Sequence, residues 1–169
     1  MKNENVRLMC LSGIFTAVVY VFTAYLQMPS HNGYIHIGDA FIYIAACLFP
    51  LPYAASVGAI GALFADCLTG FAIWAPGSVI IKAVTVLFFC AKGNKIVSLR
   101  NIVAIVPAAV MCVGGYYLYE SIITGNFIAP LSGIPGSITQ SVSSSIVFIA
   151  FGFALDKFKI KSKIFSGGK

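Results

Sequence analysis

The chain has 169 residues, of which 59% are hydrophobic and only 9% are charged, and its mean hydropathy is +0.94. Because soluble domains carry about 25% charged residues, this composition excludes a soluble globular protein and indicates an integral membrane protein. A membrane-spanning helix needs about 20 apolar residues, so the length allows about six spans and little else. The net charge of +6 comes from basic clusters between apolar segments, which favours a role in membrane orientation over nucleic-acid binding.

The apolar segments predict an all-α integral membrane fold in which residues 1–169 form a single transmembrane domain. The second segment ends at Pro50 and Pro52, because proline cannot continue a helix cleanly. The fourth segment is short, so we expect its helix to begin within the preceding loop. The six predicted helices cover about residues 8–27, 36–49, 53–68, 78–91, 101–122 and 137–155.

The basic residues determine the predicted orientation. With six spans both ends of the chain fall on the same side of the membrane, and every Lys and Arg except Lys82 falls there too. Because cytoplasmic segments of membrane proteins are enriched in Lys and Arg, we predict that both termini are cytoplasmic. The loops at 28–35, 69–77 and 123–136 then face outward.

Two charges on successive helices predict an ion pair. Asp66 lies about one turn before the outer end of the third predicted helix, and Lys82 lies about one turn after the outer start of the fourth. Burying a charge in a membrane costs free energy, and an opposite charge at the same depth offsets much of that cost. We therefore expect a structural ion pair between Asp66 and Lys82, with a direct ligand contact as the alternative.

A third charge, Asp39, lies near the outer start of the second predicted helix. His36 precedes it by three residues and Tyr43 follows it by four, so the three share a helical face. His36 and Asp39 are too few to bind a metal ion without a third ligand. A hydrogen-bonding cap, a contact between helices and a substrate contact all remain open for this group.

The fifth and sixth predicted helices carry further candidates for a binding pocket. Glu120 follows Tyr116 by four residues, and Tyr119 lies alongside. A carboxylate beside tyrosines, facing amide and hydroxyl groups, suits a small polar ring with an amino or cationic group. The alternative is that Glu120 lies at the water interface and the serines only allow close helix packing. The candidate substrate-binding residues, including members of the outer loops, are Glu120, Tyr116, Tyr119, Gln140, Ser144, Asn126, Trp74, His36 and Asp39.

The sequence contains no common catalytic motif. It has no H-E-x-x-H, no G-x-S-x-G and no P-loop, so we expect neither an enzyme nor a bound cofactor or metal ion. Active transport would then need a partner that supplies energy, and a stand-alone permease or channel is the alternative. On the first predicted helix, Gly13 and Ala17 are four residues apart, which lets another helix approach closely.

Four short runs carry a resemblance to a known family. They are His36-Ile37-Gly38-Asp39, Ala65-Asp66-Cys67-Leu68-Thr69-Gly70, Ala75-Pro76 and Ile80-Ile81-Lys82. In this order they resemble the S components of energy-coupling factor (ECF) transporters, which are the substrate-binding membrane subunits of vitamin importers. The resemblance implies a multi-pass protein of the bacterial cytoplasmic membrane that assembles with a transmembrane coupling protein and two ATPases. It also implies that the first three helices mainly dock on these partners, with Gly13 and Ala17 at the place of the family's Ala-x-x-x-Ala motif.

The resemblance implies that the last three helices and the first outer loop bind the substrate, a small water-soluble vitamin or precursor. The family's cobalt and nickel members begin with Met-His, whereas this chain begins Met1-Lys2, which argues against a metal ion. The subgroup that it most resembles is assigned to hydroxymethylpyrimidine or pyridoxine-like vitamers, whose amino-substituted ring would suit Glu120 with Tyr116. Riboflavin, thiamine, folate and queuosine precursors remain open.

Overall fold

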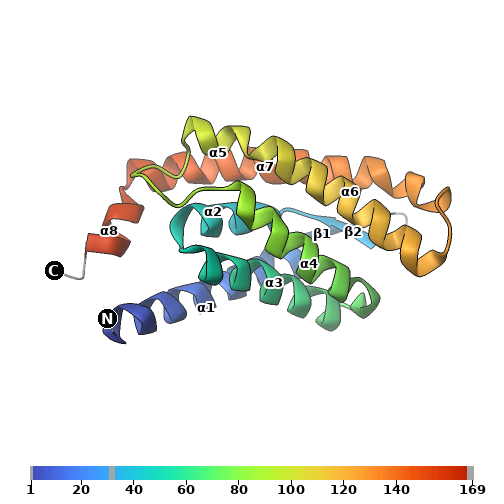
Figure 1. The fold of residues 1–169 in the computed structure, drawn as a ribbon, viewed down its shortest axis with the longest axis horizontal. Coiled ribbons are helices and arrows are strands. Elements are labelled where there is room, and N and C mark those ends of the chain that lie inside the picture. The colour runs from blue at the N-terminus through green and yellow to red at the C-terminus, as the bar shows by residue number, and fades with distance from the viewer. Residues whose placement is uncertain (1, 31–32, 167–169) are drawn as a thin grey trace.

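The computed structural model describes residues 2–30 and 33–166 and shows an elongated bundle of helices (Figure 1). Its long helices are α1 (Lys2–Ala24), α3 (Leu51–Leu68), α6 (Ile105–Thr124) and α7 (Ile134–Lys157). Within the described residues, four stretches are long and apolar enough to cross a membrane, namely Glu4–Ala24, Leu51–Leu68, Leu99–Thr124 and Ala129–Lys157. This agrees with the predicted helical membrane fold, whereas six crossings stay a prediction.

The remaining apolar helices are shorter. They are α2 (Asp39–Leu48) and a composite segment made of η1 (Ala72–Trp74), α4 (Ala75–Thr85) and η2 (Val86–Phe88). This segment begins six residues before the predicted start at Ser78, inside the preceding loop as expected. Pro76 lies in the first turn of α4, where a missing backbone N–H is no loss.

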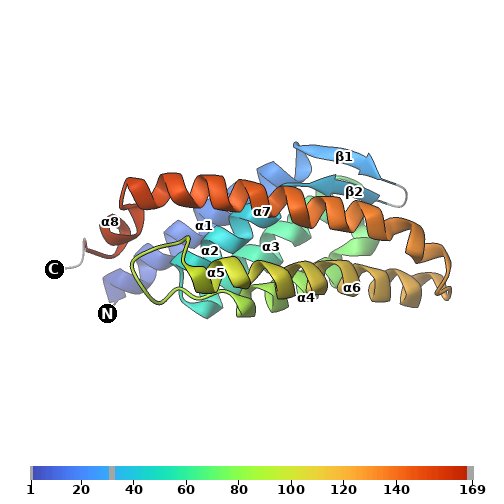
Figure 2. The same cartoon turned by 90° about the horizontal axis from the view of Figure 1, so that it is seen from above.

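A β-hairpin that the sequence analysis did not predict connects α1 to α2. Strands β1 (Gln27–Ser30) and β2 (Gly33–His36) pair antiparallel, with Gln27 opposite His36, where only a loop was expected. Because β2 extends to His36, helix α2 begins three residues later than predicted, at Asp39. Figure 2 shows the hairpin beside the N-terminal half of α7, which β2 contacts.

Helix α2 is the centre of the core. All ten of its residues are buried, and it packs against α1, α3 and α7. Tyr43 stacks on Phe89, with ring centroids 4.7 Å apart, and Phe148 meets both rings edge-on. A helix that is apolar around its whole circumference is stable only when it is surrounded by protein or lipid. The position of α2 therefore fixes how the longer helices pack around it.

Hydrogen bonds close the end of the bundle where α1 begins and α8 (Ile160–Ser166) ends (Figure 1). The connection between η2 and α5 (Leu99–Val103) lies at this end. Two backbone N–H groups of this connection, those of Ile96 (2.7 Å) and Val97 (2.9 Å), donate hydrogen bonds to the Asp156 carboxylate. Lys161 of α8 donates to the carbonyls of Cys47 and Ala91, each at 2.7 Å. The lysine-rich tail is thus partly folded onto the bundle.

Asn101 is the most buried polar side chain of this end, at 1% exposure. Its amide bonds three backbone groups, Cys90 N–H (2.9 Å), Cys90 C=O (3.1 Å) and Ile96 C=O (2.9 Å). Replacing Asn101 by Ala should lower the free energy of unfolding by about 2 kcal/mol or more, because these buried groups lose their partner. Thermal melting of the purified protein in detergent measures the effect. Asn94→Ala, at an exposed position of the same connection, is the control, and equal melting of the two variants would contradict this account.

Candidate functional site

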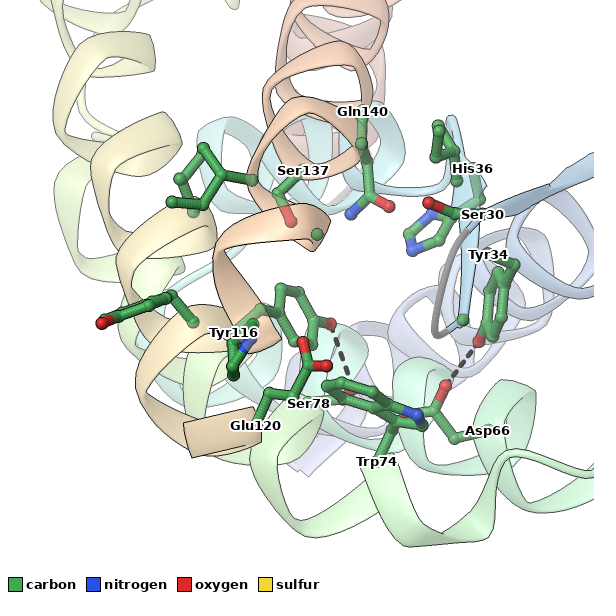
Figure 3. Close-up of a pocket in the computed structure, with 18 residues that line it drawn as sticks. Ser30, Tyr34, His36, Asp66, Trp74, Ser78, Tyr116, Glu120, Ser137 and Gln140 are labelled. Carbon is green, nitrogen blue, oxygen red and sulfur yellow. Dashed lines mark hydrogen bonds between the residues drawn. The ribbon is translucent and has the colours of Figure 1, made fainter. Parts of the chain in front are cut away.

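A pocket lies between β2, α4, α6 and α7, toward the end of the bundle opposite the start of α1 (Figure 3). Its volume is about 80 Å³, which compares with about 10–15 Å³ needed to hold one water, so it can take a small organic ring. Loop residues of η3 (Ala129–Gly133) complete its rim. Helices α6 and α7 run beside each other, which brings the polar residues of both into the same cavity.

Five of the predicted substrate-binding residues line this pocket: His36, Trp74, Tyr116, Glu120 and Gln140. The four-residue spacing of Tyr116 and Glu120 places both on the face of α6 that looks into the cavity. Trp74 meets Tyr116 edge-on, with ring centroids 6.1 Å apart. The pocket therefore combines aromatic walls with hydrogen-bonding groups, as sites for small organic ligands do.

Four predicted site residues lie outside the pocket lining, and Tyr119, Asn126 and Ser144 are three of them. Tyr119 packs over Gly77 of α4, where a Cβ atom would come within 2.5 Å of its ring, and its hydroxyl donates to the Ile73 carbonyl (2.6 Å). Asn126 accepts bonds from the loop N–H groups of Ile128 and Ala129 at 2.7 and 3.2 Å. These two residues hold the local structure of the rim. The third, Ser144, is buried one turn below Gln140 and donates to the His36 carbonyl (3.4 Å).

The predicted ion pair between Asp66 and Lys82 is wrong. Lys82 pairs with Asp39, with Nζ 2.8 Å from Oδ1 and 2.9 Å from Oδ2, and the two side chains are only 3% and 2% exposed. Asp66 accepts a hydrogen bond from the Tyr34 hydroxyl instead. Matched depth along two helices does not fix the direction in which each side chain points, and Lys82 points toward the start of α2. The fourth predicted site residue outside the pocket lining is thus Asp39, which lies in this pair.

A polar network joins the ion pair to the pocket. Gln140 donates from Nε2 to Asp39 Oδ2 at 3.0 Å. The Lys82 ammonium lies 5.0 Å from the centre of the Tyr116 ring, and the Tyr116 hydroxyl bonds that of Ser78 at 3.0 Å. Buried charges cost less free energy when further hydrogen bonds and an aromatic face surround them. The pair is therefore held by groups that also form the wall of the cavity.

Sequence reasoning missed several lining residues, above all Tyr34. It lies in β2, and burial followed by the nearby Asp66 carboxylate raises the pKa of its hydroxyl, so that the hydroxyl stays protonated and donates to Asp66. Recognising the short hairpin of Gln27–His36 would have found Tyr34. Side chains alternate between the two faces of a strand, so Tyr34 and His36, two residues apart, point toward the same side. Asp66 also lines the pocket, where the sequence analysis favoured a structural ion pair and kept a ligand contact as the alternative.

His36 is held as a neutral hydrogen-bond donor. Its Nδ1 accepts the Gly38 N–H at 3.1 Å, so the ring proton of the neutral form lies on Nε2. Burial lowers the pKa of His36, which lies in β2, to about 4, and the ring is therefore uncharged near neutral pH. In the described part of the chain, no group of three or more His, Cys, Asp or Glu residues is placed to hold a metal ion.

Long apolar helices around a small aromatic and polar pocket are the features of a membrane protein that binds a small molecule. The family model for the ECF-type riboflavin transporter, S component, matches residues 3–157, and the chain belongs to this family. Among the curated proteins, none matches the sequence at a significant level. The predicted S component is thereby confirmed: the chain is the substrate-capture subunit of an ECF transporter, and its family is a transporter family.

The observed ion pair predicts a specific pattern of coupling. Lys82→Met or Asp39→Asn alone should lower the free energy of unfolding by about 3–5 kcal/mol, because each leaves an uncompensated buried charge. The double variant should recover part of this loss. The same cycle with Asp66→Asn in place of Asp39→Asn should show a coupling of about 0.5 kcal/mol or less. Unfolding in detergent measures both cycles, and a stronger coupling of Lys82 to Asp66 would refute the assignment.

Proposed function

We propose that this S component captures riboflavin, or a vitamin with a similar flat heteroaromatic ring, from outside the cell. The observation that carries the proposal is the family model, which is named for riboflavin and matches residues 3–157. The pocket supports it, because Trp74, Tyr116 and Tyr34 provide aromatic surfaces for a flat ring. Glu120, Gln140 and His36 provide hydrogen-bonding groups around these surfaces.

Hydroxymethylpyrimidine or a B6 vitamer is the second candidate. The Glu120 carboxylate, which lines the pocket and is only 5% exposed, favours a ring with an amino group. The cavity volume of about 80 Å³ also suits a single ring better than a large ligand. The family name favours the flavin, so we place the single-ring vitamers second.

The proposed orientation places the pocket toward the outside. The C-terminal end of α7 with α8, and the connection between η2 and α5, lie at the end where α1 begins, opposite the pocket (Figure 1). These segments contain most of the basic residues of the chain. The preference of Lys and Arg for the cytoplasmic side favours this end as the inner one. We propose six crossings, with α2 and the composite segment Ala72–Phe88 completing the set, in a bacterial cytoplasmic membrane.

A coupling protein and two ATPases would supply the energy for release of the substrate. The small residues Gly13 and Ala17 on α1 favour docking of these partners there, because both are exposed. A Cβ atom added at Gly13 would meet no atom within 4 Å. A stand-alone permease or channel is the alternative. Transport at full rate by the purified chain in ATP-free liposomes would favour that alternative.

The single tryptophan gives a direct test of the ligand. Trp74 is the only Trp in the chain and lines the pocket, so its fluorescence should be quenched by bound riboflavin. Glu120→Gln should weaken riboflavin binding by about threefold to tenfold, because a charged acceptor is lost, while the melting temperature stays near that of the parent. Glu4→Gln, the same change at an exposed position of α1 outside the pocket lining, is the control. Binding of hydroxymethylpyrimidine without riboflavin would support the second candidate, and binding of neither would overturn the proposal.

Docking on α1 can be tested separately from binding. Gly13→Leu should leave the Trp74 titration unchanged, because Gly13 lies on an exposed face of α1 outside the pocket lining. The bulky side chain should reduce co-purification with the coupling protein and two ATPases by about tenfold, since a close helix contact needs small residues. Ile14→Ala, at the next exposed position, is the control. Normal assembly of the Gly13→Leu variant would exclude this surface.

A further inference from the structure

The Gln140 side chain is held in one orientation by the group behind it. Its Nε2 donates to Asp39 Oδ2 at 3.0 Å. A carboxylate only accepts hydrogen bonds, so rotating the amide by 180° would place two acceptor oxygens against each other. The amide nitrogen must therefore face Asp39, which leaves Oε1 for the cavity that Gln140 lines (Figure 3).

Asp39 is itself held in place. Lys82 contacts both of its carboxylate oxygens, at 2.8 and 2.9 Å, and Asp39 is the first residue of the buried helix α2. Negative charge is favoured at the N-terminus of a helix, where the backbone N–H groups point outward. The carboxylate is therefore fixed before any ligand arrives, and it fixes Gln140 in turn.

His36 offers the opposite group on the same wall of the pocket. Its Nδ1 is taken by the Gly38 N–H, so Nε2–H is the free donor of the ring. Ser144, one turn along α7 from Gln140, donates to the His36 carbonyl at 3.4 Å, which ties β2 to α7 at this point. Figure 3 shows His36 and Gln140 on one side of the cavity, with Trp74 and Glu120 across from them.

We infer that Gln140 Oε1 and His36 Nε2–H recognise one edge of the ligand ring, where an N–H donor lies next to a C=O or ring-nitrogen acceptor. Oε1 accepts from the ligand N–H, and Nε2–H donates to the ligand acceptor. Asp39 acts as the positioning residue for Gln140. This inference rests on the proposed function and names the part of the ligand that the site selects. Two of the proposed ligands carry such an edge: the imide edge of riboflavin, and the amino group beside a ring nitrogen of hydroxymethylpyrimidine. B6 vitamers have no N–H donor next to the ring nitrogen, so the inference selects against them. A ring whose N–H is replaced by N–CH₃ leaves Oε1 without a donor, and a polar site rejects such an analogue strongly.

The test compares two probes on the same protein, riboflavin and N3-methylriboflavin, by quenching of Trp74. Wild-type protein should bind the methylated probe about tenfold more weakly or worse. Gln140→Met should bind both probes within about twofold of each other, because the acceptor is gone and the pocket no longer distinguishes the two. Thr139→Val, at the exposed neighbouring position of α7, is the matched control and should keep the wild-type ratio.

The positioning role has its own readout. The double variant Asp39→Asn with Lys82→Met removes both charges together, so no buried charge is left alone. It should bring the ratio of the two affinities toward one, because the Gln140 amide can then rotate and offer either group. A purely structural loss would weaken both probes equally and leave the ratio unchanged, and that result would overturn the role of Asp39.

The outcomes separate this inference from the proposed function. Riboflavin binding with equal affinity for both probes would overturn the inference and leave the proposed function standing. If hydroxymethylpyrimidine binds and riboflavin does not, the same comparison is made between hydroxymethylpyrimidine and its dimethylamino analogue, with the same expected ratios. If neither parent compound binds, the proposed function fails and the inference fails with it.

Discussion

The buried pair of Lys82 and Asp39 is the interaction on which the binding end of the bundle depends. It joins α4 to α2, and through Gln140 and the Tyr116 ring it reaches α7 and α6. Such a pair adds little net stability compared with an apolar contact of the same size, because both charges must leave water. Its value is geometric. Residues of four helices meet around these two charges, and two of them, Gln140 and Tyr116, also line the pocket.

The two ends of the bundle are held by different kinds of contact. At the pocket end, bonds between side chains hold the groups behind the cavity, while Tyr119, Asn126 and Ser144 bond backbone groups around it. At the other end, Asn101, Asp156 and Lys161 bond backbone groups of neighbouring segments. Bonds to the backbone fix chain connections, whereas bonds among side chains fix a site. The ligand pocket therefore lies at one end of the bundle, and the contacts that hold the chain connections lie at the other.

Sequence alone predicted the class of protein and part of the pocket. Continuous apolar runs identify membrane helices regardless of their contacts, and the four-residue spacing of Tyr116 and Glu120 survives any packing of α6. The partner of Lys82 could not be predicted, because depth along a helix gives no angle around it. The hairpin was missed since its two strands are only four residues each. The contacts of Lys161 could not be predicted, because its carbonyl partners lie 114 and 70 residues away in the sequence.

A lysine from another helix contacts each end of helix α2. Lys82 binds the side chain of its first residue, Asp39, and Lys161 of α8 binds the backbone carbonyl of Cys47 in its last turn. Each contact follows the helix dipole, with a carboxylate at the positive end and an ammonium at the negative end. A helix of ten residues is about 15 Å long, so α2 is a short helix held by a contact at each end. Rotating or sliding α2 would therefore disturb both contacts at once, so the two lysines together fix its position along and around its axis.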